Sequence, residues 1–407
     1  MFRCKIFYVF LALILQTTPI FSYYQKGFCA VPVADCSCHC LTTLFEHQDA
    51  TTSYNTLAIS GKAGLHACPR DHQLLLHEEV IILDQIEDEI HIEVPNLFYN
   101  DTHFTSYRKK DFWTLKKNII TYQELEEKNK TYRSYLPHPI QINDTACLAY
   151  NSYTVTLKLP LYDQKAEKIY SAGTRFVLES QTDEHCNIWI FNPTSLAFDL
   201  KTIDRAICYT YEEKTKTEKL HDFINLLKMW AHPKDGAIPF VWGGCSFCTT
   251  CIQKDFKALS ENRPYQEIEY WERSDQKNPY TGFDSSSLIL RAAQIVGVPY
   301  FYKNAQTAYN NLTQLDYTET LQEGDLIWLP SGLLVVSDIS ENKIIVASGY
   351  QTGYGAIIEC DLISFFTTIN SYAELTKTYL NKLPLECKNN DGITKTFKNW
   401  SILKMPQ

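Results

Sequence analysis

The stretch Gly282-Phe-Asp-Ser-Ser-Ser-Leu-Ile-Leu-Arg-Ala-Ala293 decides the fold, because its polar start and apolar continuation predict a helix from Asp284 to Val296. Three further blocks frame it: Pro239-Phe-Val-Trp-Gly-Gly244, Leu321-Gln-Glu-Gly-Asp-Leu-Ile-Trp328 and Gly332-Leu-Leu-Val-Val-Ser-Asp338. An earlier helix is expected from Glu218, where apolar residues recur on one face through Trp230. Strands are expected at 326–329, 333–337 and 343–347. Helices followed by antiparallel strands predict an α+β layered domain.

The four blocks between Pro239 and Asp338 occur in the order and spacing of the NlpC family, so this part of the chain resembles those papain-like cell-wall peptidases. The resemblance implies a papain-like α+β domain over residues 213–372, followed by a C-terminal extension over 373–407. The block Asp284-Ser-Ser-Ser287 stands where that family has Asp-Cys-Ser-Gly, whose cysteine begins a helix. The resemblance therefore places Ser285 at the nucleophile position.

A helix N-terminus suits that chemistry, because its free N–H groups and its dipole stabilise a thiolate and later an oxyanion. A serine there attacks only if a neighbouring base removes its proton. The resemblance places the base at Leu333 and the residue that orients it at or near Val346, so both positions are aliphatic here. All eleven histidines lie at or before His232. Because nucleophile and base act as a unit, we expect a catalytically impaired homologue.

The resemblance also implies residues that recognise substrate. Asp284 corresponds to the acid that helps bind the free amino group of the murein stem peptide, and Ser286 to a serine that contacts the peptide. Asp284 has a second interpretation as a plain helix cap. Phe240 stands where the family often has tyrosine, and Trp242 belongs to a loop near the family's cleft. No metal and no other cofactor is expected in the site.

Fourteen cysteines are present, and two groups of them are dense. Cys245-Ser-Phe-Cys-Thr-Thr-Cys251 could form disulfides that staple the loop, hold zinc with a fourth ligand, or supply a substitute nucleophile. Cys36-Ser-Cys-His-Cys40 could form disulfides, present surface thiols or hold a metal. Alternate residues of a strand share a face, so these three sulfur atoms could converge.

The N-terminal half shows short apolar stretches separated by turns, which predict two small all-β barrels over residues 23–118 and 149–212. Expected strands lie at 31–34, 80–83, 90–94 and 112–115 in the first and at 154–159, 175–178 and 188–191 in the second. The first unit resembles the bacterial SH3-like domains that accompany wall peptidases, and the second reads as another barrel of that kind. Residues 119–148 form a linker whose charge run is expected on a solvated helix face. The fold class is therefore multidomain.

Residues 1–22 read as a secretory signal, because Arg3 and Lys5 precede an apolar run from Ile6 to Leu15. This run is shorter than the about 20 residues that cross a bilayer. We expect cleavage near Ser22, with an uncleaved anchor and a buried strand as alternatives. The mature chain, without a transmembrane segment, is then expected in the periplasm or cell envelope, where disulfides can form.

The formal charge of −9 and the lack of a long basic block argue against a nucleic-acid partner. Three functions fit the sequence. The first is an exported, inactive homologue of γ-D-glutamyl-diaminopimelate murein endopeptidases that binds peptidoglycan stem peptides or a partner wall enzyme. The second is an active peptidase with an atypical nucleophile such as Ser285 or Cys245. The third is an envelope or effector protein that uses the fold for protein contacts.

Overall fold

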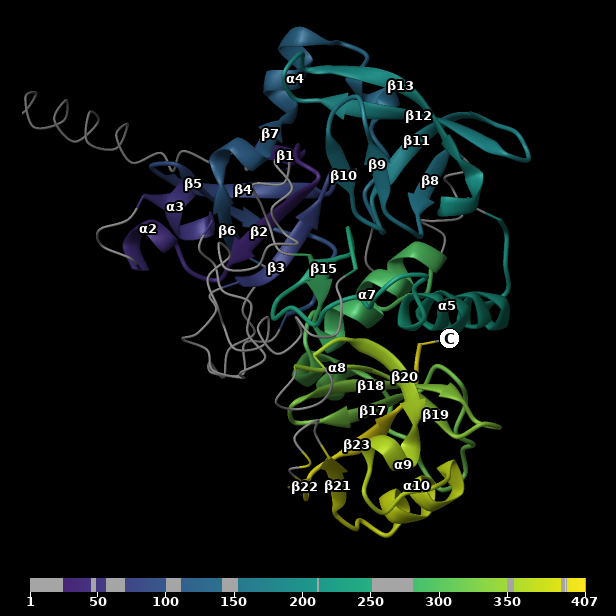
Figure 1. Cartoon of the computed structure of the whole chain (residues 1–407). Helices are drawn as coiled ribbons and strands as arrows, with labels where there is room; N and C mark the ends of the chain where they lie inside the picture. The colour runs from purple at the N-terminus through teal and green to yellow at the C-terminus, as the bar shows by residue number, and fades with distance from the viewer. Residues whose placement is uncertain are drawn as a thin grey trace, which may run out of the picture.

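A computed structural model describes residues 25–44, 49–55, 70–99, 111–140, 153–210, 212–250, 281–349, 355–388, 392 and 394–406 of the chain (Figure 1). The predicted signal segment and Cys251 lie outside these described residues. Three main sheets organise the chain in sequence order, and the helices α5 and α7 lie between the two N-terminal sheets and the C-terminal sheet (Figure 1). Among the described residues, no helix is long and apolar enough to cross a membrane.

The first unit is a seven-stranded sheet with the strand order β3-β2-β6-β5-β4-β1-β7. Its elements are β1 (Gln25–Cys29), β2 (Val33–Ser37), α2 (Leu41–Leu44), α3 (Ala50–Asn55), β3 (Arg70–Leu75), β4 (Glu79–Ile86), β5 (Glu89–Glu93), β6 (Asp111–Leu115), η1 (Lys116–Asn118) and β7 (Ile119–Thr121). The strands expected at 80–83, 90–94 and 112–115 are confirmed by β4, β5 and β6. The predicted linker starts inside the sheet, because β7 pairs with β1. The helices α4 (Tyr122–Lys128) and η2 (Tyr132–Tyr135) follow.

The second unit is a five-stranded sheet with the order β13-β12-β11-β8-β14, beside a separate two-stranded hairpin. The sheet comprises β8 (Thr154–Leu157), β11 (Arg175–Gln181), β12 (His185–Asn192), β13 (Ala197–Asp204), η3 (Arg205–Ile207) and β14 (Cys208–Thr210), and the hairpin comprises β9 (Leu161–Asp163) and β10 (Lys168–Tyr170). All three strands expected here are present. Among the described strands both N-terminal sheets have open edges, so closed SH3-like barrels stay a prediction.

The C-terminal unit has the predicted α+β layers around a five-stranded sheet of order β20-β19-β18-β17-β23. Its elements are α5 (Lys216–Ala231), β15 (Cys245–Ser246), β16 (Gly282–Phe283), α7 (Ser285–Val296), α8 (Ala305–Asn311), β17 (Leu326–Leu329), β18 (Gly332–Asp338), β19 (Lys343–Ala347), β20 (Ile357–Asp361), α9 (Leu362–Phe365), α10 (Tyr372–Leu380), β21 (Leu385–Lys388), β22 (Thr394–Phe397) and β23 (Ser401–Leu403). One face of the sheet packs on α5 and α7, and the other face packs on α9 and α10.

The predicted C-terminal extension is part of this sheet, which corrects the boundary at residue 372. Strand β23 pairs with β17 in antiparallel register, with Leu403 opposite Leu326. Lys404 Nζ also lies 2.6 Å from Asp325 Oδ2. Because an edge strand of the sheet comes from residues 401–403, the layered unit reaches at least to Leu403.

Candidate functional site

Helix α7 begins at Ser285, one residue after the predicted start, with Asp284 as its N-cap. The Ser287 N–H donates to Asp284 Oδ1 at 2.6 Å, which satisfies one of the free N–H groups at the helix start. The Asp284 N–H donates to the Gly244 carbonyl at 3.1 Å and so ties the helix start to the Trp-Gly-Gly loop. The helix-cap interpretation of Asp284 is therefore confirmed.

The other carboxylate oxygen of Asp284 binds a buried lysine. Lys303 Nζ lies 3.0 Å from Asp284 Oδ2 and 2.8 Å from Ser287 Oγ, and Lys303 is only 3% exposed. Burial is the largest single influence on the pKa of Lys303 and lowers it, but the charge and hydrogen bond of Asp284, together with Cys245 and Asp71, outweigh burial and raise that pKa above its ordinary value. Both oxygens of Asp284 are thus engaged within the protein.

Ser285, the first residue of α7, lies against the start of β18. Its Oγ accepts a hydrogen bond from the Leu333 N–H at 3.2 Å. A Cβ atom at Gly332 would lie 2.7 Å from this Oγ, so glycine permits a close approach of strand and helix. Within the described ranges no histidine bonds to the Ser285 hydroxyl, and its partner is a backbone donor rather than a base.

The strand that faces Ser285 presents aliphatic side chains. Leu333 is 3% exposed and packs in the same core as α7. Val346 pairs with Leu334 and packs in the core on the opposite face of the sheet. Side chains alternate along a strand, so this register places Ala347 opposite Leu333 on the α7 side. The sequence places the orienting position at or near Val346; of these residues Ala347 is on the α7 side, and the Val346 side chain points away from Ser285.

The other predicted recognition residues offer little surface to a ligand. Ser286 is 4% exposed, and Phe240 is 8% exposed with its N–H bonded to the Gly355 carbonyl at 2.9 Å. Trp242 is half-buried and packs against the same core as α7. The residues named from the sequence do gather around the start of α7, but most of their polar and aromatic surface is used internally.

Cys245 lies directly behind this region and is fully buried. Its N–H donates to Gln73 Oε1 at 2.9 Å, and Arg291 Nη2 lies 3.5 Å from its Sγ. Burial raises the pKa of the Cys245 thiol, although the charges of Arg291 and Lys303 oppose this shift. A buried thiol with a raised pKa makes a poor nucleophile, which argues against Cys245 as the substitute.

Arg291, on the face of α7 that points to the N-terminal units, joins all three units. It is 2% exposed, and its Nη1 donates to Glu78 in the first unit. Its Nε donates to the Cys245 carbonyl at 3.2 Å. A Cβ atom at Gly173 in the second unit would lie 2.3 Å from Arg291 Cδ, so the arginine stem packs against that turn. The start of the candidate site is therefore held by the N-terminal half.

Strand β3 forms one wall of the loop before α7. Gly243 has φ 68°, and a Cβ atom there would lie 2.2 Å from the Arg70 carbonyl oxygen. The loop thus needs glycine both for its left-handed backbone and for this contact. Behind it, Asp35 Oδ1 accepts bonds from Arg70 Nε at 2.7 Å and from Gln73 Nε2 at 2.8 Å. This buried network fixes the side chain of Gln73, which accepts the Cys245 N–H.

Among the described cysteines, neither group forms a disulfide staple, which was one of the possibilities that the sequence left open. Cys245 and Cys248 are buried thiols without a disulfide, and the third cysteine of that group lies outside the described residues. In the other group, strand β2 ends at Ser37, so Cys36, Cys38 and Cys40 do not share one strand face. Cys36 Sγ approaches the Ala34 carbonyl, Cys38 Sγ approaches Tyr99 and Cys40 Sγ approaches Glu89, so the three sulfur atoms do not converge.

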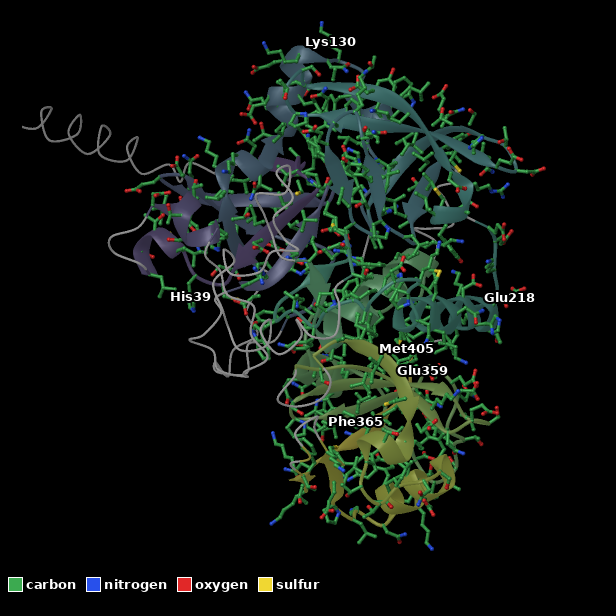
Figure 2. All side chains as sticks on the ribbon, viewed as in Figure 1. His39, Lys130, Glu218, Glu359, Phe365 and Met405 are labelled. Carbon is green, nitrogen blue, oxygen red and sulfur yellow. The ribbon has the colours of Figure 1, made fainter. Side chains whose placement is uncertain are left out.

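The histidines near the C-terminal unit have other partners. His232 Nε2 lies 2.9 Å from Glu359 Oε2 on β20, and Glu359 is labelled in Figure 2. His72 on β3 is buried, and burial together with Lys303 and Arg291 lowers its pKa well below the ordinary value. Among the described residues, no three His, Cys, Asp or Glu side chains are grouped so that they could hold a metal ion.

Lys303, Arg291 and Gln73 are the residues around the helix start that sequence reasoning missed. A faint signal exists for Lys303, because it directly follows the apolar run Val298-Pro-Tyr-Phe-Tyr302, where a charge needs a partner if it is buried. Arg291 likewise interrupts an apolar helix. Their partners cannot be identified from local pattern, since Glu78 lies 213 residues from Arg291.

The fold resembles that of NlpC/P60 family structures. The chain is similar to the crystal structure of an NlpC/P60 family protein from Bacillus cereus ATCC 10987, with 15% sequence identity, a TM-score of 0.50 and coverage of 83% of this chain and 94% of that chain. This similarity establishes the fold alone.

Two further structures match, NlpC2 and NlpC1 from Trichomonas vaginalis. Each has 11% identity and covers 94% of this chain; the TM-scores are 0.32 and 0.29, with 99% and 95% of those chains covered. No family model matches the sequence. A comparison with curated proteins finds no match either.

Proposed function

We propose that the protein is an exported, cell-wall-associated homologue of γ-D-glutamyl-diaminopimelate murein endopeptidases that binds stem peptide without cleaving it. The observation that carries the proposal is the environment of Ser285. Its Oγ accepts the Leu333 N–H, and the side chain that follows on that strand is a buried leucine instead of a base. An unassisted serine hydroxyl is a weak nucleophile near neutral pH.

The polar groups of the helix start support binding less directly. Asp284 is the acid that the family resemblance links to the amino group of the stem peptide, yet Lys303 already supplies an ammonium group to it. A peptide ammonium would have to displace a side chain that is only 3% exposed. The proposal therefore expects peptide binding that does not depend on a free α-amino group.

Purified muropeptides test the proposal, with cleavage followed by mass spectrometry and binding by calorimetry. We expect intact muropeptides, saturable binding, and equal affinity for peptides with a free or an acetylated α-amino group. Ser285→Ala serves as the control and should change neither result. Cleavage that Ser285→Ala abolishes would establish an active serine peptidase, and absent binding would favour a role in protein contacts.

Export is the second part of the proposal and rests on the basic start and apolar run of residues 1–22. Mass spectrometry of the envelope fraction should find a chain that begins near residue 23. An intact Met1 in cytoplasmic material would contradict export and leave the muropeptide experiment unaffected.

A further inference from the structure

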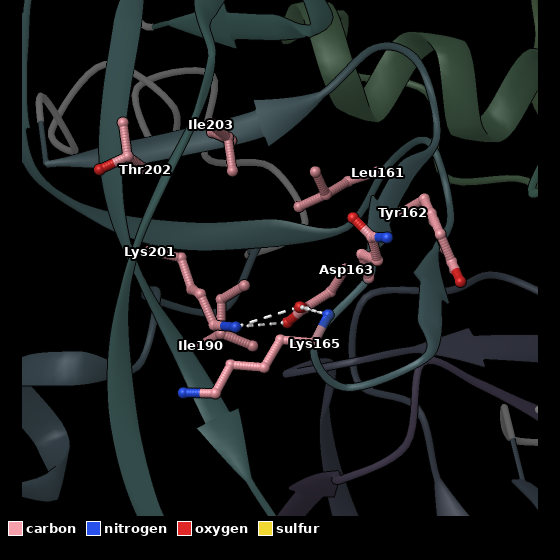
Figure 3. Close-up of a pocket in the computed structure, with 9 residues that line it drawn as sticks. Leu161, Tyr162, Asp163, Lys165, Ile190, Lys201, Thr202 and Ile203 are labelled. Atoms are coloured by element: carbon pink, nitrogen blue, oxygen red, sulfur yellow. Dashed lines mark hydrogen bonds and ion pairs between the residues drawn. The ribbon is translucent and has the colours of Figure 1, made fainter.

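A cavity of about 400 Å³ lies in the second unit, and Ser285 is not among the residues that line it (Figure 3). It is lined by the hairpin residues Leu161, Tyr162, Asp163, Gln164 and Lys165, and by Ile190, Lys201, Thr202 and Ile203 from β12 and β13. Its volume falls within the roughly 300–1,000 Å³ of typical ligand pockets. Nothing in the proposed function uses this cavity.

Two open strand edges border the cavity. Strand β13 is an edge of the five-stranded sheet and pairs with β12 alone, and β9 pairs only with β10 among the described strands. Successive side chains of a strand point to opposite faces of the sheet. Three consecutive residues can therefore line the same cavity only where the cavity extends around the free edge of their strand. Lys201–Ile203 and Leu161–Asp163 both meet this condition. An edge strand such as β13 has backbone donors and acceptors that can pair with an extended chain.

The floor of the cavity is apolar and its rim is charged. Ile190 and Ile203 are 4% and 6% exposed, and Leu161 packs against the same core. Asp163 Oδ2 lies 2.8 Å from Lys201 Nζ, while Asp163 Oδ1 accepts the N–H of Lys165 at 3.1 Å. The ion pair holds the hairpin to β13, while the Lys165 N–H bond lies within the hairpin itself (Figure 3).

One positively charged side chain on the rim, Lys165, can pair with a bound ligand. Asp163, Lys165 and Lys201 give the lining a net charge of +1, since one carboxylate faces two ammonium groups. Asp163 neutralises Lys201, whereas the Lys165 ammonium is exposed and makes no hydrogen bond or ion pair within the described part of the chain. In Figure 3 the Lys165 side chain extends from the hairpin toward the side that carries Lys201. The rim therefore complements a carboxylate, although the whole chain carries −9.

We propose that this cavity binds an extended acidic peptide of a partner protein, which adds as a strand along the open edge of β13 and leaves the Asp163–Lys201 ion pair in place. Alternate apolar side chains of the peptide would contact Ile190 and Ile203, and a carboxylate would pair with Lys165. Main-chain hydrogen bonds supply affinity in this mode of recognition, and the pockets for alternate side chains supply specificity.

Fluorescence anisotropy tests the site with the full chain and a fluorescein-labelled hexapeptide of alternating glutamate and valine. We expect saturable binding, weaker binding of the matching lysine–valine peptide, and loss of binding when alternate residues of the acidic peptide are N-methylated. Lys165→Glu should weaken the acidic peptide by about five-fold and improve the lysine peptide, as expected for one exposed ion pair. Lys398→Glu, at an exposed lysine far along the chain, is the matched control and should change neither affinity.

Circular dichroism of both variants verifies that each is folded before affinities are compared. Equal binding of the two peptides, equal losses in both variants, or unchanged binding of the N-methylated peptide would each overturn the proposal. Binding of a muropeptide in place of the acidic peptide would also overturn it. So would a concentration-dependent dimer, seen by light scattering, that excludes the peptide.

Discussion

Helix α7 and strands β18 and β19 meet at Ser285, yet they are built from opposite kinds of side chain. On the helix side, Asp284 and Lys303 form a buried ion pair, and Arg291 binds a carboxylate from the first unit. On the strand side, Leu333 and Ala347 belong to an aliphatic core. The helix side is polar and hydrogen-bonded, and the strand side is apolar.

Under the proposed function, this difference separates residues that stabilise the fold from residues that would serve only a reaction. A cap at the start of α7 and ion pairs between units stabilise the folded chain whether or not a reaction takes place. A histidine on β18 would serve only the reaction and would otherwise place a polar ring in an apolar layer. We therefore interpret the helix side as retained for stability.

The largest effect should come from repair of the strand side. Ser285→Cys restores a thiol at the helix start, and Leu333→His supplies its base, so the double variant should gain detectable cleavage of a γ-D-glutamyl-diaminopimelate substrate. Neither change alone should suffice, because loss of one member of such a unit costs roughly a million-fold. The buried imidazole should cost about 1–3 kcal/mol if one nitrogen stays unpaired. Circular dichroism must show a folded protein before rates are measured.

A third substitution sharpens this experiment. Ala347→His should raise the activity of the double variant, because Ala347 lies opposite Leu333 on the α7 face. Val346→His should not, because Val346 packs in the core on the other face. If the folded Ala347 variant neither cleaves the substrate nor reacts with a thiol-directed peptide probe, the strand side was never the second half of a cleft.

The elements around the cleft were largely predictable. Strands at 326–329 and 343–347 match β17 and β19 in both bounds, and α7 starts one residue after the predicted Asp284, which caps it. These features follow from local periodicity and from capping chemistry, which a short window of sequence contains.

The remaining features depend on contacts that no short window holds. Strand β23 joins β17 from residues 401–403, and Arg291 meets Glu78 across 213 residues. The orienting position could be placed only at or near Val346, because a shift of one residue along a strand exchanges its faces. The sequence pattern located this part of the strand, but it did not give the register that decides whether Val346 or Ala347 points toward Ser285.

On the helix side, removal of the charge that joins the units should have the largest effect on stability. Arg291→Met leaves the half-buried carboxylate of Glu78 without its cationic partner and should lower the free energy of unfolding by up to about 3–5 kcal/mol, the range for a fully buried pair. Urea denaturation measures this loss. Arg205→Met removes a surface arginine, paired with exposed Asp183 at 3.6 Å, and should leave the midpoint nearly unchanged. Equal midpoints for the two variants would contradict a stabilising role for the helix side.

The buried His77 should also make the free energy of unfolding depend on pH. Burial lowers the pKa of His77 to about 4 from an ordinary 6.5. Between these values the unfolded chain binds a proton that the folded chain does not, so the free energy of unfolding should fall as pH decreases from about 6.5 to about 4. The loss should reach roughly 3 kcal/mol at about 1.4 kcal/mol per pH unit. Urea midpoints across this range measure it.

His77→Asn is the control for that titration. Asparagine suits the φ of 72° at this position and can donate to the Arg175 carbonyl, which lies 2.9 Å from His77 Nδ1. The variant should lose less stability on acidification than the native chain. Some pH dependence should persist, because His72 keeps its lowered pKa. An unchanged slope would show that His77 does not titrate as its burial requires.

The smallest effect should come from replacing the buried pair at the helix start as a whole. Asp284→Asn alone leaves the ammonium of Lys303 unpaired, and Lys303→Met alone leaves the carboxylate unpaired, so each should destabilise the fold. The double variant should stay within about 1 kcal/mol of the native chain, because a buried ion pair can be exchanged for neutral groups at little cost and asparagine still caps the helix. Denaturation of all four chains gives the coupling energy between the two positions. A double variant as unstable as either single variant would show that these charges stabilise contacts beyond their own ion pair.

Muropeptide binding by the same double variant then separates the two roles of Asp284. Unchanged affinity would mean that Asp284 acts only as a helix cap. Lost affinity with intact stability would make it a ligand-binding acid, which the proposed function does not require.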